Sequence, residues 1–316
     1  MVEVFHNPMD LEMDFGDVEV HSNDPNTPVA VSEQIAVGSY DSMYEETFEQ
    51  DEINEVDIVF VVDNSGSMGG NQTNLRNNIE GFMNVFILSG IDYHIGFITT
   101  DSASMVGGLI DSTAVDPVGD VQDIIDSIGT SGSPTEKGIE YSYEALQTGN
   151  DFGPGSTFWR NDAKLIIVYV SEEDDMSSVT PTTFYTYITT LKGGADYVTA
   201  HAVAGDYPGG CSTNGGAAEA YLYHTLVGYL HGTFLSICAD DWGTPLETLA
   251  NESILKTSFT LTKQAVEETI YVEVDGVAVT EWTYDSTTNA VSFNEGHIPD
   301  AGANIYISYN PVSECT

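Results

Sequence analysis

One stretch of the chain, Val56–Met68, constrains the fold more than any other. It begins with an uninterrupted apolar run, Ile58–Val62, which is rich in β-branched residues. This composition is typical of a strand that is buried on both faces, as in the centre of a parallel sheet. The run ends abruptly at Asp63, and Ser65 and Ser67 follow it at spacings of two. The sequence therefore predicts a central strand that delivers a carboxylate and two hydroxyls to one edge of a sheet.

The position and chemistry of these oxygens indicate a metal site. Open α/β sheets bind ligands outside the carboxyl ends of their strands. Hard oxygen donors at such a place suit Mg²⁺ or Ca²⁺ rather than zinc. The alternative is an ordinary polar turn in which Ser65 caps the following helix.

The segment D-I-V-F-V-V-D-N-S-G-S-M resembles the metal-ion-dependent adhesion site of von Willebrand factor A (VWA) domains. Such domains occur in integrins, matrix proteins and many bacterial surface proteins. The resemblance implies that Asp63, Ser65 and Ser67 hold Mg²⁺ or Ca²⁺, with Mn²⁺ as a further option.

A second loop supplies one hydroxyl to the metal in the resembled family, just before a helix. Here the segment G-T-S-G-S-P-T-E-K-G-I-E begins at Gly129, and alignment on Gly138 places Ser133 at the ligand threonine. Thr135 is the near alternative. Both can instead serve the helix start, because Ser133 with Glu136 also fits a capping box.

A third loop follows a second apolar run, Lys164–Val170. The family normally has threonine, aspartate and glycine there, and that aspartate faces the metal. In this chain Glu172 stands in its place, so the metal is expected to be reached by Glu172 directly, through water, or by Asp174 instead. Four consecutive acids, residues 172–175, favour Ca²⁺, which tolerates a larger and more flexible ligand set than Mg²⁺. A solvated acidic turn is the alternative.

We expect the rim that sets specificity to comprise Asn64, Met68, Gly69, Gly70 and Asp101.

Alternating strand and helix patterns predict an α/β fold with a doubly wound, mostly parallel sheet flanked by helices. The predicted helices are residues 71–88, 118–128, 181–191, 217–229 and 242–249. Within residues 129–146, a Ser/Thr/Gly loop is expected to run into a further helix. Beyond the run at 56–62, the predicted strands are residues 93–99, 164–170, 197–205 and 233–237. We expect residues 1–52 to form an acidic arm with short strands at 34–40 and 44–48, and residues 53–252 to form the VWA-like domain.

Residues 253–316 alternate with period two and predict a small antiparallel all-β domain. Its expected strands are residues 259–262, 269–274, 277–284, 290–293 and 304–309. The tracts S-I-C-A-D-D-W, V-D-G-V-A-V-T-E-W-T-Y-D-S-T-T-N-A-V-S-F and G-A-N-I-Y-I-S-Y-N-P are similar to a bacterial group of exported VWA proteins with a β tail.

The charge of the chain excludes several classes of partner. Fifty acidic residues stand against 7 basic ones, for a formal net charge of −43 in 316 residues. Such a surface repels nucleic acid and anionic membranes, attracts divalent cations, and needs salt or bound cations to screen its self-repulsion. A saline, extracellular setting is therefore expected.

The cysteines and the termini bear on location. Of three cysteines, Cys211 and Cys238 flank a predicted helix–strand unit, and a disulfide between them would stabilise the fold by about 3 kcal/mol; Cys315 is left over. Three buried thiols are the alternative. No stretch of about 18 apolar residues is present to span a bilayer, and no signal peptide is visible. These features predict a mature exported fragment, a cytosolic product or a virion component.

Three functions are weighed. The first is a cation-dependent adhesion or protein-binding module at a cell or particle surface, whose metal accepts a carboxylate of a partner. The second is a structural virion or appendage subunit that self-assembles. The third, a metal-dependent hydrolase, lacks an evident base, because His94, His201, His224 and His231 have no obvious partner and no H-E-x-x-H motif occurs. We therefore expect a protein that is not an enzyme.

Overall fold

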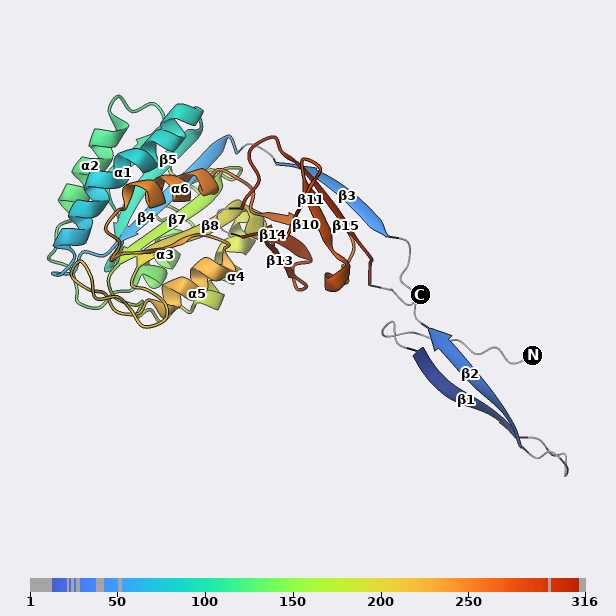
Figure 1. Cartoon of the computed structure of the whole chain (residues 1–316). Helices are drawn as coiled ribbons and strands as arrows, with labels where there is room; N and C mark the ends of the chain where they lie inside the picture. The colour runs from blue at the N-terminus through green and yellow to red at the C-terminus, as the bar shows by residue number, and fades with distance from the viewer. Residues whose placement is uncertain are drawn as a thin grey trace.

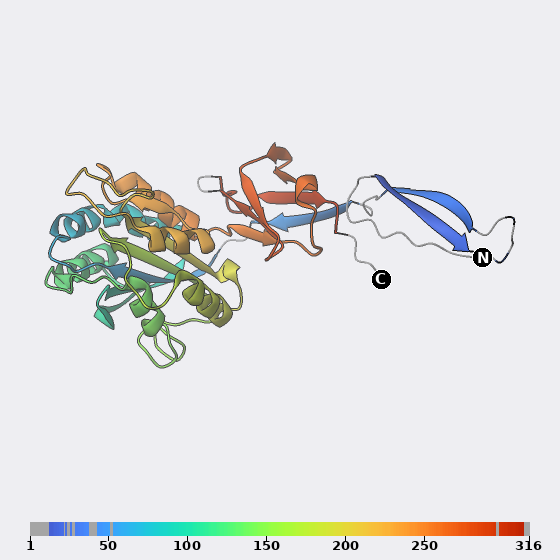
Figure 2. The same ribbon diagram turned by 90° about the horizontal axis from the view of Figure 1, so that it is seen from below.

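The computed structural model describes residues 13–21, 23, 26, 29–37, 43–50, 53–294 and 297–312. These residues form a large α/β domain, a smaller β module and a separate N-terminal hairpin, arranged in a row (Figures 1 and 2). Cys315 lies outside the described residues.

A six-stranded sheet forms the centre of the α/β domain, with the strand order β6-β5-β4-β7-β8-β9. All neighbours are parallel except β5 and β6, which are antiparallel. The predicted mostly parallel sheet is therefore confirmed. Its strands are β4 (Glu55–Val62), β5 (Asp92–Thr99), β6 (Ser102–Asp111), β7 (Lys164–Ser171), β8 (Val198–Ala204) and β9 (Phe234–Ser236).

Helices cover both faces of this sheet (Figure 1). On one face Phe60 of β4 stacks on Phe97 of β5 at a centroid distance of 4.8 Å and meets Phe82 of the first helix edge to face. The six helices of the domain are α1 (Gly69–Ser89), α2 (Pro117–Ile128), α3 (Gly138–Ala145), α4 (Pro181–Lys192), α5 (Tyr221–Tyr229) and α6 (Gly243–Ser253). A short 3₁₀ helix, η1 (Ala195–Tyr197), precedes β8.

The apolar periodicity predicted α1 correctly. Leu75, Ile79, Phe82, Met83 and Phe86, which recur at spacings of three and four, are all fully buried. These residues form one stripe, as expected for an amphipathic helix. The stripe packs on β4 and β5, and its side chains form one hydrophobic core with the residues of these strands.

Two elements of the α/β domain differ from prediction. The predicted helix over residues 217–229 begins only at Tyr221, because Ala217 pairs with Cys211 in an antiparallel bridge. The edge strand β6 was not predicted. Its partly exposed residues do not alternate regularly, and its pairing with β5 is interrupted by register shifts.

The β module contains two small antiparallel sheets, with the orders β10-β14-β13 and β12-β11-β15-β3. Its elements are β10 (Ser258–Thr260), η2 (Glu267–Thr269), β11 (Tyr271–Val274), β12 (Val277–Val279), β13 (Trp282–Asp285), β14 (Ala290–Phe293) and β15 (Asn304–Tyr309). The predicted strand at 277–284 is thus divided between two sheets.

The module also uses a strand from before the α/β domain. β3 (Tyr44–Glu49) pairs with β15, and Phe48 packs against Phe259 at a centroid distance of 5.4 Å. The expected N-terminal arm therefore ends inside the module's sheet, and the α/β domain is inserted between two parts of one β unit. β1 (Met13–His21) and β2 (Val29–Val37) form a hairpin beyond the module. β2 includes residues 34–37 of the strand predicted at 34–40, and residues 38–40 lie outside the described residues.

This topology determines where the site lies. β4 begins beside the module at Glu55, and Asp63 follows its other end. Eight residues of strand span about 26 Å, so Asp63 lies at the end of the α/β domain that faces away from the module.

Candidate metal centre

Asp63 is fully buried at the carboxyl end of β4. Its backbone nitrogen donates to the carbonyl of Val170 in the neighbouring strand β7 (2.9 Å). Its Oδ1 accepts the Ser65 amide (2.7 Å), and its Oδ2 accepts the Ser171 hydroxyl (2.9 Å). Strand pairing and these two bonds fix the carboxylate at the position that the sequence predicted.

The hydroxyls of Ser65 and Ser67 approach each other to 3.5 Å. Helix α1 begins at Gly69 without a side-chain cap, so Ser65 does not serve as a cap. Gln72, in the first turn of α1, donates to the Asp63 carbonyl (2.9 Å) and to the Gly129 carbonyl (2.8 Å). The loop is thereby tied to the second loop of the site.

Glu136 is a site residue that the sequence suggested only as a partner of Ser133 in an alternative capping box. It is fully buried, and the hydroxyl of Thr100 donates to its Oε2. Its side chain lies within hydrogen-bonding reach of Asp63, and its Oε1 has no hydrogen-bond partner among the described residues. Burial, followed by the negative charges of Asp63 and Glu173, raises the pKa of Glu136 to about 7.

The alternative of a capping box formed by Ser133 and Glu136 is not observed, because the Ser133 hydroxyl accepts the Thr135 amide. Helix α3 begins at Gly138 without a cap from its own N-cap residue. The Asp175 carboxylate instead accepts the Ile139 amide (3.0 Å), and the hydroxyl of Ser177 accepts the Glu140 amide (2.8 Å). Glu136 is thus free to turn inward. The signal in the sequence was an acid two residues before the start of α3, in a loop of small residues.

The loop residues Ser133 and Thr135 bond locally. The Ser133 hydroxyl accepts the Thr135 amide (3.0 Å), and the Ser133 amide donates to Asp101 Oδ2 (3.1 Å). From the same loop, Glu136 is the residue whose pKa responds to the charge of Asp63.

The acids of the third loop take different positions. Glu172 Oε2 accepts the Asn71 amide group of α1 (3.1 Å). Burial, followed by the negative charges of Asp63 and Glu172, raises the pKa of Glu173. Asp174 Oδ1 accepts the Leu222 amide at the start of α5 (2.9 Å). Glu173 therefore interacts electrostatically with Asp63, whereas Asp174 bonds the first turn of α5.

The geometry places the residues of the expected rim as follows. Asn64 donates to Asp101 Oδ1 (3.2 Å), which joins two of its members, and Gly69 is exposed. Burial opposes ionisation of Asp101, but hydrogen bonds from Thr99, the Ser133 amide and Asn64 lower its pKa. Met68 is wrong as a rim residue, because its side chain is fully buried in the core.

Two buried tyrosines lie beneath the carboxylates. The Tyr223 hydroxyl has no hydrogen-bond partner among the described residues, and the charges of Asp175, Asp63 and Glu136 act on it. The Tyr169 hydroxyl lies 2.8 Å from that of Ser142. Burial raises the pKa of both tyrosines, so both remain neutral proton donors below the site.

The donor set fits a hard divalent cation. Asp63 and Glu136 supply carboxylate oxygens, Ser65 and Ser67 supply hydroxyls, and the unpartnered Glu136 Oε1 points to a missing positive charge. Within the described residues, no three His, Cys, Asp or Glu side chains converge as a metal-binding group. A cation at this site would therefore depend on the serine hydroxyls as well as on the carboxylates, which is typical of Mg²⁺ and Ca²⁺.

The third loop is braced by a disulfide. Cys211 and Cys238 are bonded with a Cα–Cα distance of 6.3 Å, which confirms the predicted pair. The segment enclosed by the bridge contacts the site, because the Ala218 amide donates to the Glu172 carbonyl (2.9 Å). The covalent link thus limits the movement of the segment that holds Glu172.

Comparison with known proteins identifies the class. The family model of the von Willebrand factor type A domain matches residues 57–186, which contain β4, the Asp63 loop, Glu136 and the acidic loop. The chain therefore carries a VWA domain. No curated protein sequence matches the chain.

Three solved structures illustrate the similarity. A von Willebrand factor type A protein from Catenulispora acidiphila is 13% identical with a TM-score of 0.45, over 87% of this chain and 66% of that one. The mussel byssus proximal thread matrix protein 1 with a zinc-occupied MIDAS motif is 16% identical (TM-score 0.42; 67% of this chain, 48% of that one). The pilus adhesin SpaC from Lactobacillus rhamnosus GG is 13% identical (TM-score 0.38; 96% and 43%). The chain spans at most 66% of the length of each of these proteins.

Proposed function

We propose that the protein is a divalent-cation-dependent binding module that recognises a carboxylate of a partner protein or surface. Asp63, Ser65 and Ser67 hold the cation together with Glu136, and Glu172 or Glu173 completes the shell directly or through water. Ser133, Thr135 and Asp174 surround these residues in the second and third loops. One coordination position is left for the partner's acid. The cation supplies the positive charge that makes binding of an acid favourable at this strongly negative surface.

The observation that carries this proposal is the buried pair of Asp63 and Glu136. Two carboxylates that are both fully buried repel each other and lose hydration. The charges that act most strongly on Glu136 are those of further carboxylates, Asp63 and Glu173. A divalent cation would offset this repulsion and satisfy the open Glu136 Oε1.

The oxygen donors favour Mg²⁺ or Ca²⁺, with Mn²⁺ as a further option. Glu136, together with Glu172 or Glu173, increases the negative charge of the proposed site. Ca²⁺ tolerates such flexible carboxylate sets better than Mg²⁺ does. We therefore expect Ca²⁺ to bind at least as tightly as Mg²⁺.

Location at a cell or particle surface follows from two features. The disulfide between Cys211 and Cys238 is typical of oxidising compartments. The net charge of −43 favours a saline medium that screens self-repulsion. Within the described part of the chain, no helix is long and apolar enough to cross a membrane.

A hydrolytic role has little support, because the histidines serve other contacts. His201 Nδ1 accepts the Thr233 amide (2.9 Å) in the core, and burial lowers the pKa of this histidine to about 3. His94 bonds the Phe158 carbonyl (2.9 Å), and His224 packs on Tyr207 at a centroid distance of 4.4 Å. We therefore propose a non-enzymatic role.

Calorimetric titration with Mg²⁺, Ca²⁺ and Mn²⁺ tests the cation. Asp63→Ala should abolish binding, whereas Asp300→Ala, which removes an exposed acid in the β module, should leave it unchanged. Retained affinity in Asp63→Ala would contradict the proposal.

Partner binding is tested separately, by measuring adhesion to immobilised proteins and cell surfaces with and without a chelator. Analytical ultracentrifugation under the same conditions measures self-assembly. Cation-dependent assembly without adhesion would favour a structural subunit of a virion or appendage.

A further inference from the structure

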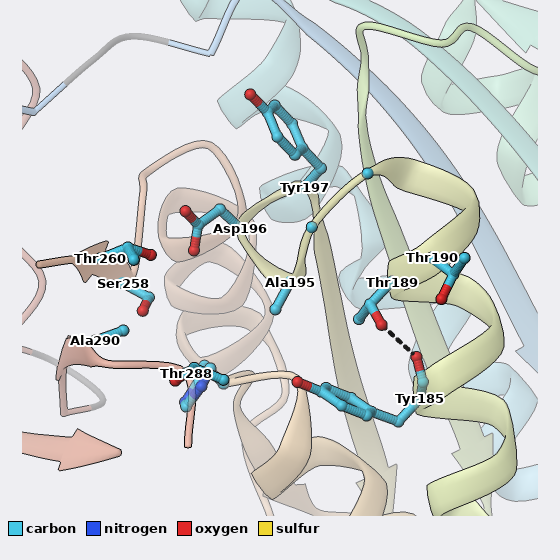
Figure 3. Close-up of a pocket in the computed structure, with 13 residues that line it drawn as sticks. Tyr185, Thr189, Thr190, Ala195, Asp196, Tyr197, Ser258, Thr260, Thr288 and Ala290 are labelled. Atoms are coloured by element: carbon cyan, nitrogen blue, oxygen red, sulfur yellow. Dashed lines mark hydrogen bonds between the residues drawn. The ribbon is translucent and has the colours of Figure 1, made fainter. Parts of the chain in front are cut away.

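A cavity of about 550 Å³ lies between the VWA domain and the β module, on the far side of the molecule from Asp63. Helix α4, η1 and the turn after α5 form one wall, and β10 with the turn before β14 forms the other. Its volume is within the range of about 300–1,000 Å³ that is usual for small-molecule sites. Figure 3 shows side chains from both units around it.

The lining is polar and rich in hydroxyls. Tyr185, Asp196 and His231 contribute from the VWA domain, and Ser258, Thr260 and Thr288 contribute from the β module. In Figure 3 the Tyr185 ring extends from α4 toward Thr288, and Asp196, Ser258 and Thr260 lie across from it. These residues offer hydrogen-bond donors and acceptors together with the aromatic ring of Tyr185, and Tyr197 also lines the cavity.

Charged groups of both units converge on this cavity. The charges of Asp285 on β13 and of Asp196 act on both Tyr185 and His231. Burial lowers the pKa of His231 and raises that of Tyr185, so both side chains are neutral at physiological pH. The positively charged Lys256 has its Nζ 3.9 Å from Asp196 Oδ2.

This chemistry excludes several ligand classes. Asp196 and Asp285 would repel an anion. An aliphatic ligand would cover these hydroxyls without offering them hydrogen-bond partners, which is unfavourable. No group of three His, Cys, Asp or Glu side chains that could hold a metal occurs in the described residues, which include this cavity.

A neutral polyhydroxyl ring satisfies all of these conditions. The C–H face of a pyranose packs on an aromatic ring, and its hydroxyls need acceptors such as a carboxylate and partners such as hydroxyls and a neutral imidazole. The Tyr185 ring is held in place by Tyr229, at a centroid distance of 5.8 Å. A fixed ring loses little conformational entropy when a ligand binds to it.

We propose that this cavity is a binding site for a neutral sugar ring, such as one residue of a surface glycan. Tyr185 provides the stacking face. The sugar hydroxyls form hydrogen bonds with Asp196, His231 and the hydroxyls of Ser258, Thr260 and Thr288. Because both units line the site, a bound sugar also adds contacts between the VWA domain and the β module. This site is independent of the metal centre.

Saturation-transfer NMR and calorimetry with the methyl glycosides of glucose, galactose, mannose and N-acetylglucosamine test the proposal on the full chain. At least one glycoside should bind in the millimolar range or more tightly. Thr260→Trp, which fills the cavity from an exposed strand position, and Tyr185→Ala, which removes the stacking face, should each weaken that binding at least about tenfold.

Two control variants keep the test specific. Tyr271→Ala removes an exposed tyrosine elsewhere on the β module, and Asp63→Ala disables the metal centre; both should bind the glycoside like the unmodified protein. Because Thr260 is exposed, its replacement should fold even if Tyr185→Ala does not. Absence of binding by all four glycosides, or unchanged binding in Thr260→Trp, would overturn the proposal.

Discussion

The carboxyl group of Glu136 lies against that of Asp63, and both side chains are fully buried. The two residues come from different loops and are brought together by the pairing of β4 with its neighbours and by the turn before α3. This contact adds a carboxylate to the site from the same loop that carries Ser133 and Thr135.

The first prediction concerns pH and the Glu136 side chain. In metal-free protein its pKa is raised from 4.5 to about 7, so the unfolded state releases this proton first as the pH rises. Stability should therefore fall between about pH 4.5 and 7, by about 2 kcal/mol for a shift shared by a coupled pair. Glu136→Gln should remove this loss, and saturating Ca²⁺ should reverse it in the unmodified protein. Denaturant unfolding at several pH values measures both effects.

The second prediction separates Glu173 from Asp174. Glu173→Gln should weaken Ca²⁺ binding about tenfold, because the charge of Glu173 acts on the same site as those of Asp63 and Glu136. Asp174→Asn should leave the affinity nearly unchanged but cost about 1 kcal/mol of stability, since Asp174 accepts the Leu222 amide at the start of α5. Calorimetry and thermal unfolding of the two variants decide the matter. The opposite pattern would assign Asp174 to the metal.

The third prediction concerns Lys164, a fully buried lysine that donates to the Leu255 carbonyl (2.8 Å). Burial lowers its pKa from 10.5 to about 7, so the unfolded chain binds a proton that the folded chain lacks between these values. This residue should make stability rise with pH from about 7 to 10.5. Lys164→Met should flatten that slope, and Lys263→Met, at an exposed lysine, should not. Equal slopes for both variants would contradict the assignment.

The fourth prediction tests the contribution of β3 to the β module. Phe48→Ala should destabilise the module by about 2–4 kcal/mol, because Phe48 packs on Phe259 in its core. Calcium binding at Asp63 should remain intact, since the site lies at the far end of the VWA domain. Two-step thermal unfolding with the module melting first is the expected result. A coupled loss of cation affinity would show that the two units are not independent.

The sequence by itself determined the centre of the molecule. A run of β-branched residues that ends in Asp63, Ser65 and Ser67 can be satisfied only by a buried strand with a polar loop at its end, because neither face of the strand can meet water. The buried stripe of α1 and the disulfide pair Cys211–Cys238 could likewise be predicted, since periodicity and cysteine spacing are local properties of the chain.

Tertiary structure alone decided how the loops meet. Glu136 and Ser133 are both compatible with capping α3, and only the arrival of Asp175 from another loop frees Glu136 to face Asp63. Met68 follows a polar loop in sequence, yet the packing of α1 on the sheet buries it. β3 is joined to the module by its pairing with β15, a contact between the two ends of the chain that no local pattern encodes. These outcomes depend on which distant groups compete for the same hydrogen bonds and the same apolar surface, and that competition exists only in the folded chain.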